Sequence, residues 1–313
     1  MTSESLSDFV VGARSLVKHF GTVTALDGLD LTVRAGEIHG FLGPNGAGKS
    51  TTIRALPDQL RLSSGTATVL GHDAWHHAVD IHARLAYVPG DTLLWPNLTG
   101  GERIDLLGGF HGAMNQARRD EPVERFDLDP TRRFRTYSKG NRQKVALVAA
   151  LSCDVELLVL DEPTSGLDPL MEAVFQAVVT ERCAAGTSVL LSSHILAEVE
   201  TLCDRLTVVR SGRSVFTGSL AQLCSSAATA VEVVTPDAVP GLERTHGVSH
   251  LRSQAEPQGH RTTLLAEAAA LPTVLTMVAS ARPLQVAVHP PSLEQLFLDQ
   301  HTQPAGDDGG GPR

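Results

Sequence analysis

The stretch GPNGAGKST, residues 43–51, is the most informative in the chain. It fits the pattern G-x-x-x-x-G-K-[ST], and it follows EIHGFL at 37–42, which has the composition of a buried strand. Glycines at this position let backbone N–H groups converge on phosphate oxygens, and the start of the next helix adds partial positive charge. Lys49 would then reach the outer phosphates, and the Ser50 hydroxyl would ligate Mg²⁺. The stretch therefore predicts a nucleoside triphosphate site.

Length and composition limit the class of protein. The 313 residues suffice for one large domain and a smaller one, and a hydrophobic fraction of 42% is ordinary for a globular chain. The formal net charge of −9 argues against general nucleic-acid binding. The N-terminus lacks the basic and apolar regions of an export signal, and the most apolar run, 145–160, is broken by polar residues. We expect a cytoplasmic protein that does not cross a membrane, with its four cysteines reduced.

Apolar runs and turn residues predict the order of the elements. A helix should follow the glycine loop and end early at Pro57, and helical spacing occupies about 90–145, where Thr99 to Glu102 forms a capping box. Helical stretches separate the strand-like runs after this insert, which favours parallel connections. The strand-like stretches are 13–20, 29–33, VELLVLDEP (155–163), TSVLLSSH (187–194) and a hairpin at 204–218 turning at Ser211 and Gly212.

The pattern changes beyond Ser225 to that of a smaller α+β module. We expect strands at 230–234, 261–267 and 284–289, a helix at 272–281, and a last helix opened by a capping box at Ser292. The expected organisation is a tail at 1–10, a large domain at 11–224, the accessory domain at 225–302 and an unfolded tail at 303–313.

Two carboxylates follow the buried run LLVL. Asp161 would emerge beside the phosphate loop, where it can hold Mg²⁺. Adjacent side chains on a strand point to opposite faces, so Glu162 is better explained by a second role, orienting the attacking water. An ordinary solvated strand end is the alternative for the pair when it is taken alone.

Four motifs stand in the order and spacing of one family: GPNGAGKST (43–51), YSKGNRQK (137–144), LLVLDEPTSGLD (157–168) and LLSSH (190–194). Over roughly 11–220 the chain resembles the ATP-binding-cassette (ABC) ATPases, the motor subunits of ABC transporters. The resemblance implies an α/β P-loop fold with a mostly parallel sheet, an antiparallel N-terminal β-subdomain and an α-helical insert. It implies ATP and Mg²⁺ as cofactors.

The resemblance also assigns roles to residues. Phe20 resembles the aromatic that stacks on adenine, with a core aromatic as the alternative, and residues 165–168 resemble the loop at the dimer seam. His194 resembles the switch histidine at the γ-phosphate, with a structural histidine as the alternative. The implied residues are catalytic Lys49, Glu162 and His194; ATP-binding Phe20, Gly43, Pro44, Asn45, Gly46, Ala47, Gly48, Lys49, Ser50, Thr51, Ser138 and Gly140; and metal-binding Ser50 and Asp161.

The stretch YSKGNRQK raises the question of why a second anion-binding loop is present. In this family two domains sit head to tail, and the signature loop of one covers the ATP held by the other. Ser138 and the amide of Gly140 would therefore act in trans. The chain holds one set of motifs, so the resemblance implies a homodimer or a homologous ATPase subunit, together with a separately encoded membrane permease.

Two positions depart from the family pattern. Gly90, followed by Asp91, stands where the family usually has a metal-contacting glutamine, and Lys139 and Asn141 differ from the commonest signature. Lys139 and Asn141 resemble the signature variant of drug and antibiotic exporters, and PPSLEQLFL at 290–298 resembles the end of drug-resistance exporter ATPases. We therefore expect an ATPase subunit on the inner face of the membrane that drives export of an antibiotic or other hydrophobic compound. The alternatives are a soluble ABC ATPase acting on nucleic acid or ribosomes, and an ATP-gated regulatory subunit.

Overall fold

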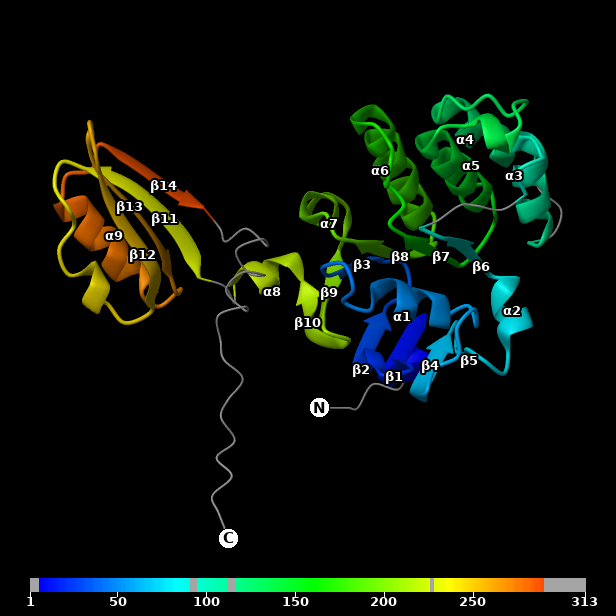
Figure 1. The fold of residues 1–313 in the computed structure, drawn as a ribbon, viewed down its shortest axis with the longest axis horizontal. Coiled ribbons are helices and arrows are strands. Elements are labelled where there is room, and N and C mark those ends of the chain that lie inside the picture. The colour runs from blue at the N-terminus through cyan, green and yellow to red at the C-terminus, as the bar shows by residue number, and fades with distance from the viewer. Residues whose placement is uncertain (1–5, 91–94, 112–115, 226–227, 290–313) are drawn as a thin grey trace, which may run out of the picture. The chain divides into compact units, whose positions relative to one another are not determined.

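The computed structural model describes residues 6–90, 95–111, 116–225 and 228–289. These residues form two compact units, the first ending at Leu220 and the second beginning at Ala221 (Figure 1). None of the described helices is both long and apolar enough to span a bilayer.

A six-stranded sheet forms the centre of the first unit. Its strands pair in parallel except for the last hairpin, where β9 (Arg205–Arg210) and β10 (Arg213–Ser219) are antiparallel around the predicted turn at Ser211 and Gly212. The sequence expectation of parallel strands separated by helices is confirmed. In spatial order the strands are β10 (Arg213–Ser219), β9 (Arg205–Arg210), β3 (Ile38–Leu42), β8 (Ser188–Ser193), β7 (Leu157–Asp161) and β6 (Leu85–Val88).

The two faces of this sheet bury alternate residues of the same strands. Leu157 and Val159 of β7 pack toward helix α1 (Lys49–Ala55), whereas Leu158 and Leu160 pack toward α5 (Lys139–Leu151) and α6 (Pro169–Ala184). We call these the P-loop face and the helix face. Because both faces are covered, β7 is a continuous apolar run rather than an alternating one.

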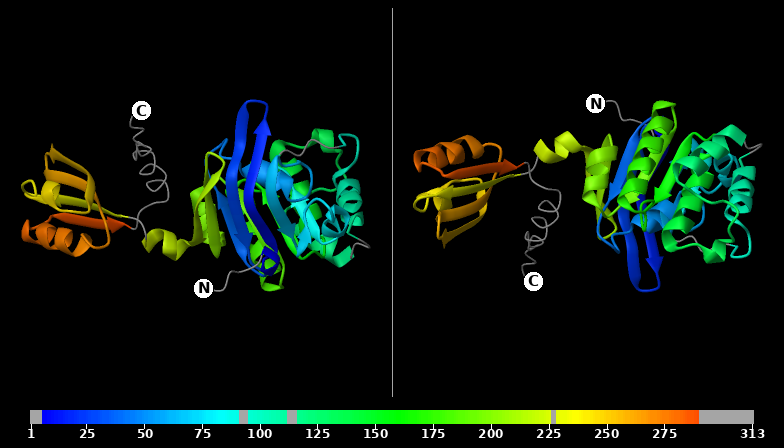
Figure 2. Two further views of the ribbon diagram at one scale, coloured as in Figure 1. Left: turned by 90° about the horizontal axis from the view of Figure 1, so that it is seen from below. Right: turned by 90° about the horizontal axis from the view of Figure 1, so that it is seen from above.

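An antiparallel sheet covers the P-loop face. Its spatial order is β2 (Val23–Val33), β1 (Val11–Phe20), β4 (Ser64–Val69) and β5 (His72–Asp73). Leu29 and Leu31 of β2 are buried in the core that this sheet shares with α1. Figure 1 shows α1 between the two sheets, and the left view of Figure 2 shows the antiparallel strands in front of the six-stranded sheet.

Two helix boundaries in this unit lie where proline and capping residues predicted them. Helix α1 ends at Ala55, ahead of Pro57. Thr99 caps α3 and forms the predicted capping box with Glu102. The other bounds are η1 (Leu6–Asp8), α2 (Ala78–His82), α3 (Gly100–Gly109), α4 (Gln116–Arg125), η2 (Phe134–Thr136), α5 (Lys139–Leu151), α6 (Pro169–Ala184) and α7 (Leu196–Leu202). Helix α8 (Leu220–Ser225) begins at the last residue of this unit and continues into the second.

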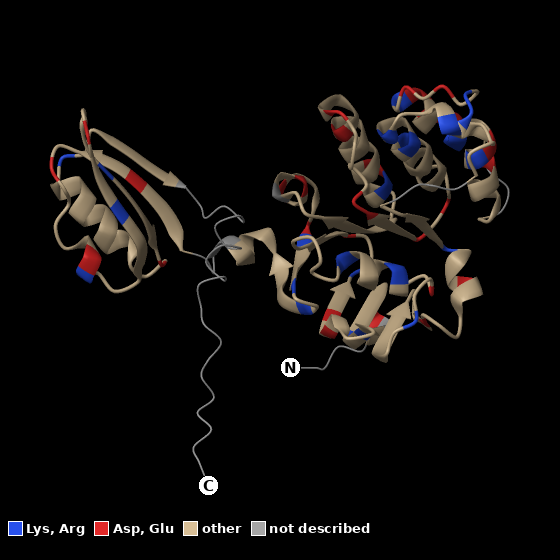
Figure 3. Ribbon diagram, viewed as in Figure 1, with Lys and Arg blue, Asp and Glu red and all other residues tan. Residues whose placement is uncertain are grey.

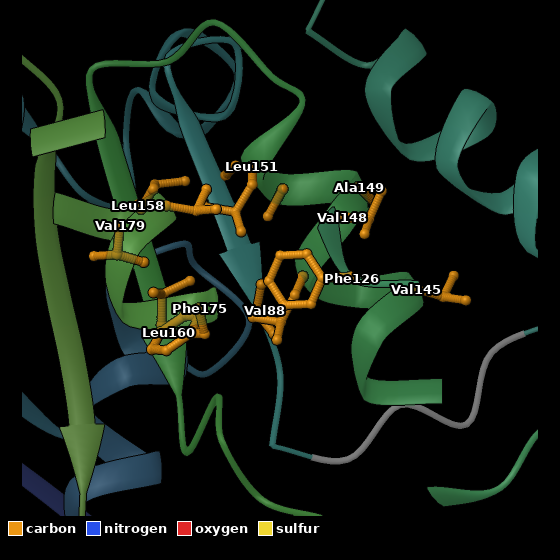
Figure 4. Close-up of a cluster of buried hydrophobic side chains, with 14 of the residues drawn as sticks. Val88, Phe126, Val145, Val148, Ala149, Leu151, Leu158, Leu160, Phe175 and Val179 are labelled. Atoms are coloured by element: carbon orange, nitrogen blue, oxygen red, sulfur yellow. The ribbon is translucent and has the colours of Figure 1, made fainter. Parts of the chain in front are cut away.

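The core on the helix face fixes the start of α5 relative to the sheet. Phe126, Val148 and Phe175 meet Leu158 and Leu160 of β7 in one buried cluster (Figure 4). Burying side chains of this size contributes about 1.5–3 kcal/mol each to folding. The loop ahead of α5 is therefore positioned in part by the packing of this helix against the sheet.

The second unit is a four-stranded antiparallel sheet with one helix against it. The spatial order is β12 (Val248–Glu256), β13 (Gly259–Ala266), β11 (Thr229–Thr235) and β14 (Gln285–His289), with η3 (Leu242–Arg244) and α9 (Leu271–Ser280). Three of these strands and α9 were expected. The sequence missed β12 because this edge strand is largely exposed and shows no apolar alternation. The helix expected from Ser292 and the tail at 303–313 lie outside the described residues.

Candidate functional site

The glycine loop runs from the end of β3 into α1, as its sequence predicts. Gly48 caps α1 with a φ of 106°, and a Cβ there would lie 2.7 Å from Leu26 Cδ2. The Gly212 amide of the β9–β10 turn donates to the Ala47 carbonyl at 2.9 Å. A glycine is thus required inside the loop, and a second turn holds the loop from outside.

Lys49 is buried at the centre of the loop. Its ammonium donates to the Gly43 carbonyl at 2.7 Å and to the Pro44 carbonyl at 3.3 Å, and it lies 3.8 Å from Glu162 Oε1. Burial lowers the pKa of Lys49, while Glu162 and Asp161 oppose that shift. The cation is held where the phosphate loop turns, beside a carboxylate.

Asp161 is joined to the loop through hydroxyl groups. Ser50 Oγ donates to Asp161 Oδ1 at 3.2 Å, and Ser192 Oγ donates to the same oxygen at 2.6 Å. Asp161 is 1% exposed, so these hydrogen bonds form away from bulk water and offset part of the cost of burying the charge. The ends of β7 and β8 and the start of α1 therefore meet at one carboxylate.

Glu162 lies beyond the end of β7 in a left-handed conformation. Its φ is 47°, and its backbone N–H bonds Ser192 Oγ at 3.0 Å. Its side chain turns toward Lys49 and toward His194, whose Nδ1 lies 3.4 Å from Glu162 Oε1. The strand alternation used to separate Asp161 from Glu162 does not apply here, because the strand ends at Asp161. The positive φ sends the two carboxylates to different neighbours instead.

Gly90 lies beside Asp161, two residues beyond the end of β6. A Cβ on Gly90 would be 3.4 Å from the Asp161 carbonyl oxygen and 3.6 Å from Oδ2, which are ordinary contact distances. The expected glutamine position therefore adjoins the expected metal ligand. Asp91 lies outside the described residues.

The stretch YSKGNRQK opens helix α5, with Ser138 as the N-cap accepting from the Asn141 amide at 3.2 Å. Gly140 contacts Gly166 so closely that a Cβ would lie 2.4 Å from the Gly166 carbonyl oxygen. The Lys139 ammonium donates to Ser165 Oγ at 3.0 Å. The signature loop and the 165–168 loop are thus one joined surface.

This joined surface is separate from the glycine loop of the same chain. Among the described residues, no hydrogen bond or ion pair links Ser138 or Gly140 to residues 43–51. Phe20, at the end of β1, is 50% exposed with the Lys18 ammonium 4.9 Å from its ring centre. The alternative of a core aromatic at Phe20 is therefore wrong, and its ring is accessible for stacking.

Sequence reasoning missed three residues that build the site. Ser192 ties Asp161 and Glu162 to β8, Gly212 supports the glycine loop, and Gln143 donates to the Pro163 carbonyl at 2.9 Å from inside α5. Ser192 could have been found, because its strand partner in a parallel sheet is Asp161. The other two depend on packing between distant segments.

The chain is similar to known proteins over most of its length. Residues 26–165 match the family model described as ABC transporter. The daunorubicin resistance ATP-binding protein DrrA2 of Streptomyces coeruleorubidus is 33% identical over 94% of this chain and 95% of its own. The chain belongs to the ABC transporter family of ATP-binding proteins. It is an ABC transporter ATPase.

Two further relatives of this ABC ATPase extend the comparison. The linearmycin resistance ATP-binding protein LnrL of Bacillus subtilis (strain 168) is 30% identical over 92% of this chain and 96% of its own. The solved dimeric structure of MJ0796, a bacterial ABC transporter cassette, shares the fold with a TM-score of 0.62 and 20% identity, covering 67% of this chain and 98% of that one.

The room beside Asp161 in this ABC ATPase predicts that a glutamine side chain is tolerated at Gly90. We expect Gly90→Gln to fold normally and to change the Mg²⁺ concentration for half-maximal ATPase activity by less than about threefold, because its Cβ makes ordinary contacts and because Mg²⁺ gives up its waters reluctantly and keeps several of them as ligands. Magnesium titration of ATPase activity measures this. Gly140→Ala is the matched control without room, and it should lose activity. A tenfold loss of ATPase activity in Gly90→Gln would contradict the presence of room for a side chain beside Asp161.

Proposed function

We propose that this ABC ATPase drives the export of an antibiotic or another hydrophobic compound through a separately encoded membrane permease, at the inner face of the cell membrane. The observation that carries the proposal is similarity along nearly the whole chain, the second unit included, to relatives named for resistance to daunorubicin and linearmycin. Similarity confined to the cassette would support ATP hydrolysis alone.

The catalytic roles follow from charge and reach. Glu162 is the general base for the attacking water, because its carboxylate is held beside Lys49 and His194 at the mouth of the loop. Lys49 binds the outer phosphates, exchanging its carbonyl partners for phosphate oxygens, and the amides of 43–51 cradle the rest. His194 contacts the γ-phosphate and holds Glu162 in place.

The residues beside the loop fit Mg²⁺. Asp161 and Ser50 supply oxygen ligands, which this hard cation prefers, and a buried carboxylate fixed by two hydroxyls is already in place to hold it. Bound Mg²⁺ would neutralise charge on the phosphate oxygens. Ser192 would keep its hydrogen bond and orient Asp161 from behind.

A second cassette completes the site. Ser138 and the Gly140 amide lie at a helix N-terminus that suits an anion, yet they are not joined to the phosphate loop of their own chain. They therefore cover the ATP of a second copy or of a homologous subunit, consistent with the dimer solved for the MJ0796 cassette. ATP closes this dimer and hydrolysis reopens it.

A cavity of about 950 Å³ between β6 and helices α2, α3 and α5 is the proposed docking place for a permease segment. It is lined mainly by apolar side chains, and two at its edge, Phe110 and Val79, are 68% and 83% exposed. Pro89 lines the cavity and precedes Gly90, where an added Cβ would lie 3.6 Å from Asp161 Oδ2. A permease segment bound there would therefore act on Asp161, the proposed metal ligand, through Pro89 and Gly90. Figure 3 shows both basic and acidic residues on the segment from α3 to α5.

The role of Glu162 predicts a trapped dimer. Glu162→Gln should bind ATP with near-normal affinity but hydrolyse it at least about a hundredfold more slowly, since the amide cannot accept the proton. Gel filtration with ATP and Mg²⁺ should then show an ATP-bound dimer that the wild type does not accumulate. Hydrolysis at the wild-type rate would show that Glu162 is not the base.

The docking proposal predicts a specific loss of assembly. Phe110→Asp should reduce co-purification with a neighbouring-gene membrane protein of about six spans and abolish any resistance to daunorubicin or linearmycin that the pair confers, because a charge enters an apolar contact. Its ATP affinity should be unchanged. Val215→Asp, at an exposed apolar residue of β10, is the matched control. Equal co-purification of both variants would contradict docking at this cavity.

A further inference from the structure

A buried carboxylate outside the nucleotide loop links the two segments that carry Glu162 and His194. Glu198 lies in α7 and is 7% exposed. Helix α7 packs against the helix face of the sheet, on the side away from the P-loop, where Val199 contacts the position of Gly40. A buried acidic side chain at this place needs a reason, because burial of a charge is costly unless hydrogen bonds satisfy it.

Both oxygens of this carboxylate accept hydrogen bonds from hydroxyl groups. Thr164 Oγ1 donates to Glu198 Oε1, and Ser193 Oγ donates to Glu198 Oε2 at 2.6 Å. Thr164 is itself 6% exposed and Ser193 2% exposed, so the three groups form a network shielded from water. Charge-assisted hydrogen bonds in such surroundings are strong and directional.

The two hydroxyl residues belong to the catalytic segments. Thr164 follows Glu162 by two residues, in the turn that leaves β7, and Ser193 directly precedes His194 at the end of β8. Because strand residues alternate, Ser192 faces the P-loop and bonds Asp161, whereas Ser193 faces α7 and bonds Glu198. The network therefore crosses from one catalytic segment to the other behind the site.

We propose that Glu198 is a positioning residue that holds Glu162 and His194 in register. It does not touch the nucleotide; it fixes the distance between the two turns, and so the 3.4 Å approach of His194 Nδ1 to Glu162 Oε1. The inference rests on the proposed roles of Glu162 and His194. Glu162 has a φ of 47°, a conformation that persists when its surroundings over-determine it, and the Thr164 hydrogen bond is one such restraint.

A purely structural role is the competing explanation, since Glu198 also lies in the first turn of α7, where an acidic residue favours the helix. The two explanations differ in what a substitution changes. If Glu198 only stabilises the helix, its substitution lowers the stability of the protein and leaves the turnover of the folded protein intact. If Glu198 positions Glu162, its substitution lowers kcat at constant nucleotide affinity, because a small displacement of a general base costs about a hundredfold in rate.

The experiment compares Glu198→Ala, Glu198→Gln and the exposed neighbour Glu200→Ala in the full chain. We expect Glu198→Ala to lower kcat for ATP at least about tenfold with KM changed less than about twofold, and Glu200→Ala to match the wild type. Glu198→Gln should keep kcat within about threefold, since its amide can accept from one hydroxyl and donate to the other. Wild-type kcat in Glu198→Ala, or a loss in Glu198→Gln as large as in Glu198→Ala, would overturn the proposal.

A second measurement reads the geometry without turnover. The ¹⁵N-imidazole resonances of His194, assigned through His194→Ala, should shift in Glu198→Ala and in Thr164→Val/Ser193→Ala, and remain in place in Glu200→Ala. Adding Glu198→Ala to Thr164→Val/Ser193→Ala should change neither kcat nor the spectrum further, because the three groups act as one unit. A His194 signal unchanged in Glu198→Ala would contradict the proposed positioning of His194 by Glu198. Failure of the wild type to hydrolyse ATP would instead contradict the proposed function, leaving this spectral test to decide the positioning.

Discussion

The rest of the site depends on one buried carboxylate. Asp161 accepts hydrogen bonds from Ser50 at the start of α1 and from Ser192 at the end of β8, and it is 1% exposed. An unpaired charge at this depth would cost several kcal/mol, so the three segments are held together by the same interaction that prepares the proposed metal ligand. Removing a hydroxyl partner would therefore disturb folding and metal binding together.

The alternation of β7 and β8 distributes the work between two faces. Odd residues of β7 and even residues of β8 face the P-loop, which brings Asp161 and Ser192 together. The opposite set faces the helices, which brings Ser193 to Glu198. One pair of apolar strands thus supplies the proposed metal ligand on one face and the proposed restraint on the other, and the proposed catalytic groups at their ends are held from both faces.

Sequence alone was sufficient where the constraint is local. The glycine loop, the helix end before Pro57 and the cap at Thr99 follow from residue chemistry within a few positions. It failed where distant segments decide. The left-handed backbone of Glu162 depends on neighbours in β8, and the buried environment of Glu198 depends on α7 folding back on the sheet. Neither pairing has a short-range sequence signal.

The central claim is that each ATP site uses Lys49 of one chain and Ser138 of another. Mixing Lys49→Ala with Ser138→Arg chains, and isolating the heterodimer by two tags, leaves one site with both lesions and one with neither. The account predicts that ATPase activity of this heterodimer exceeds that of either parent, because one complete site turns over. A heterodimer no more active than its parents, or wild-type activity in Ser138→Arg alone, would contradict it.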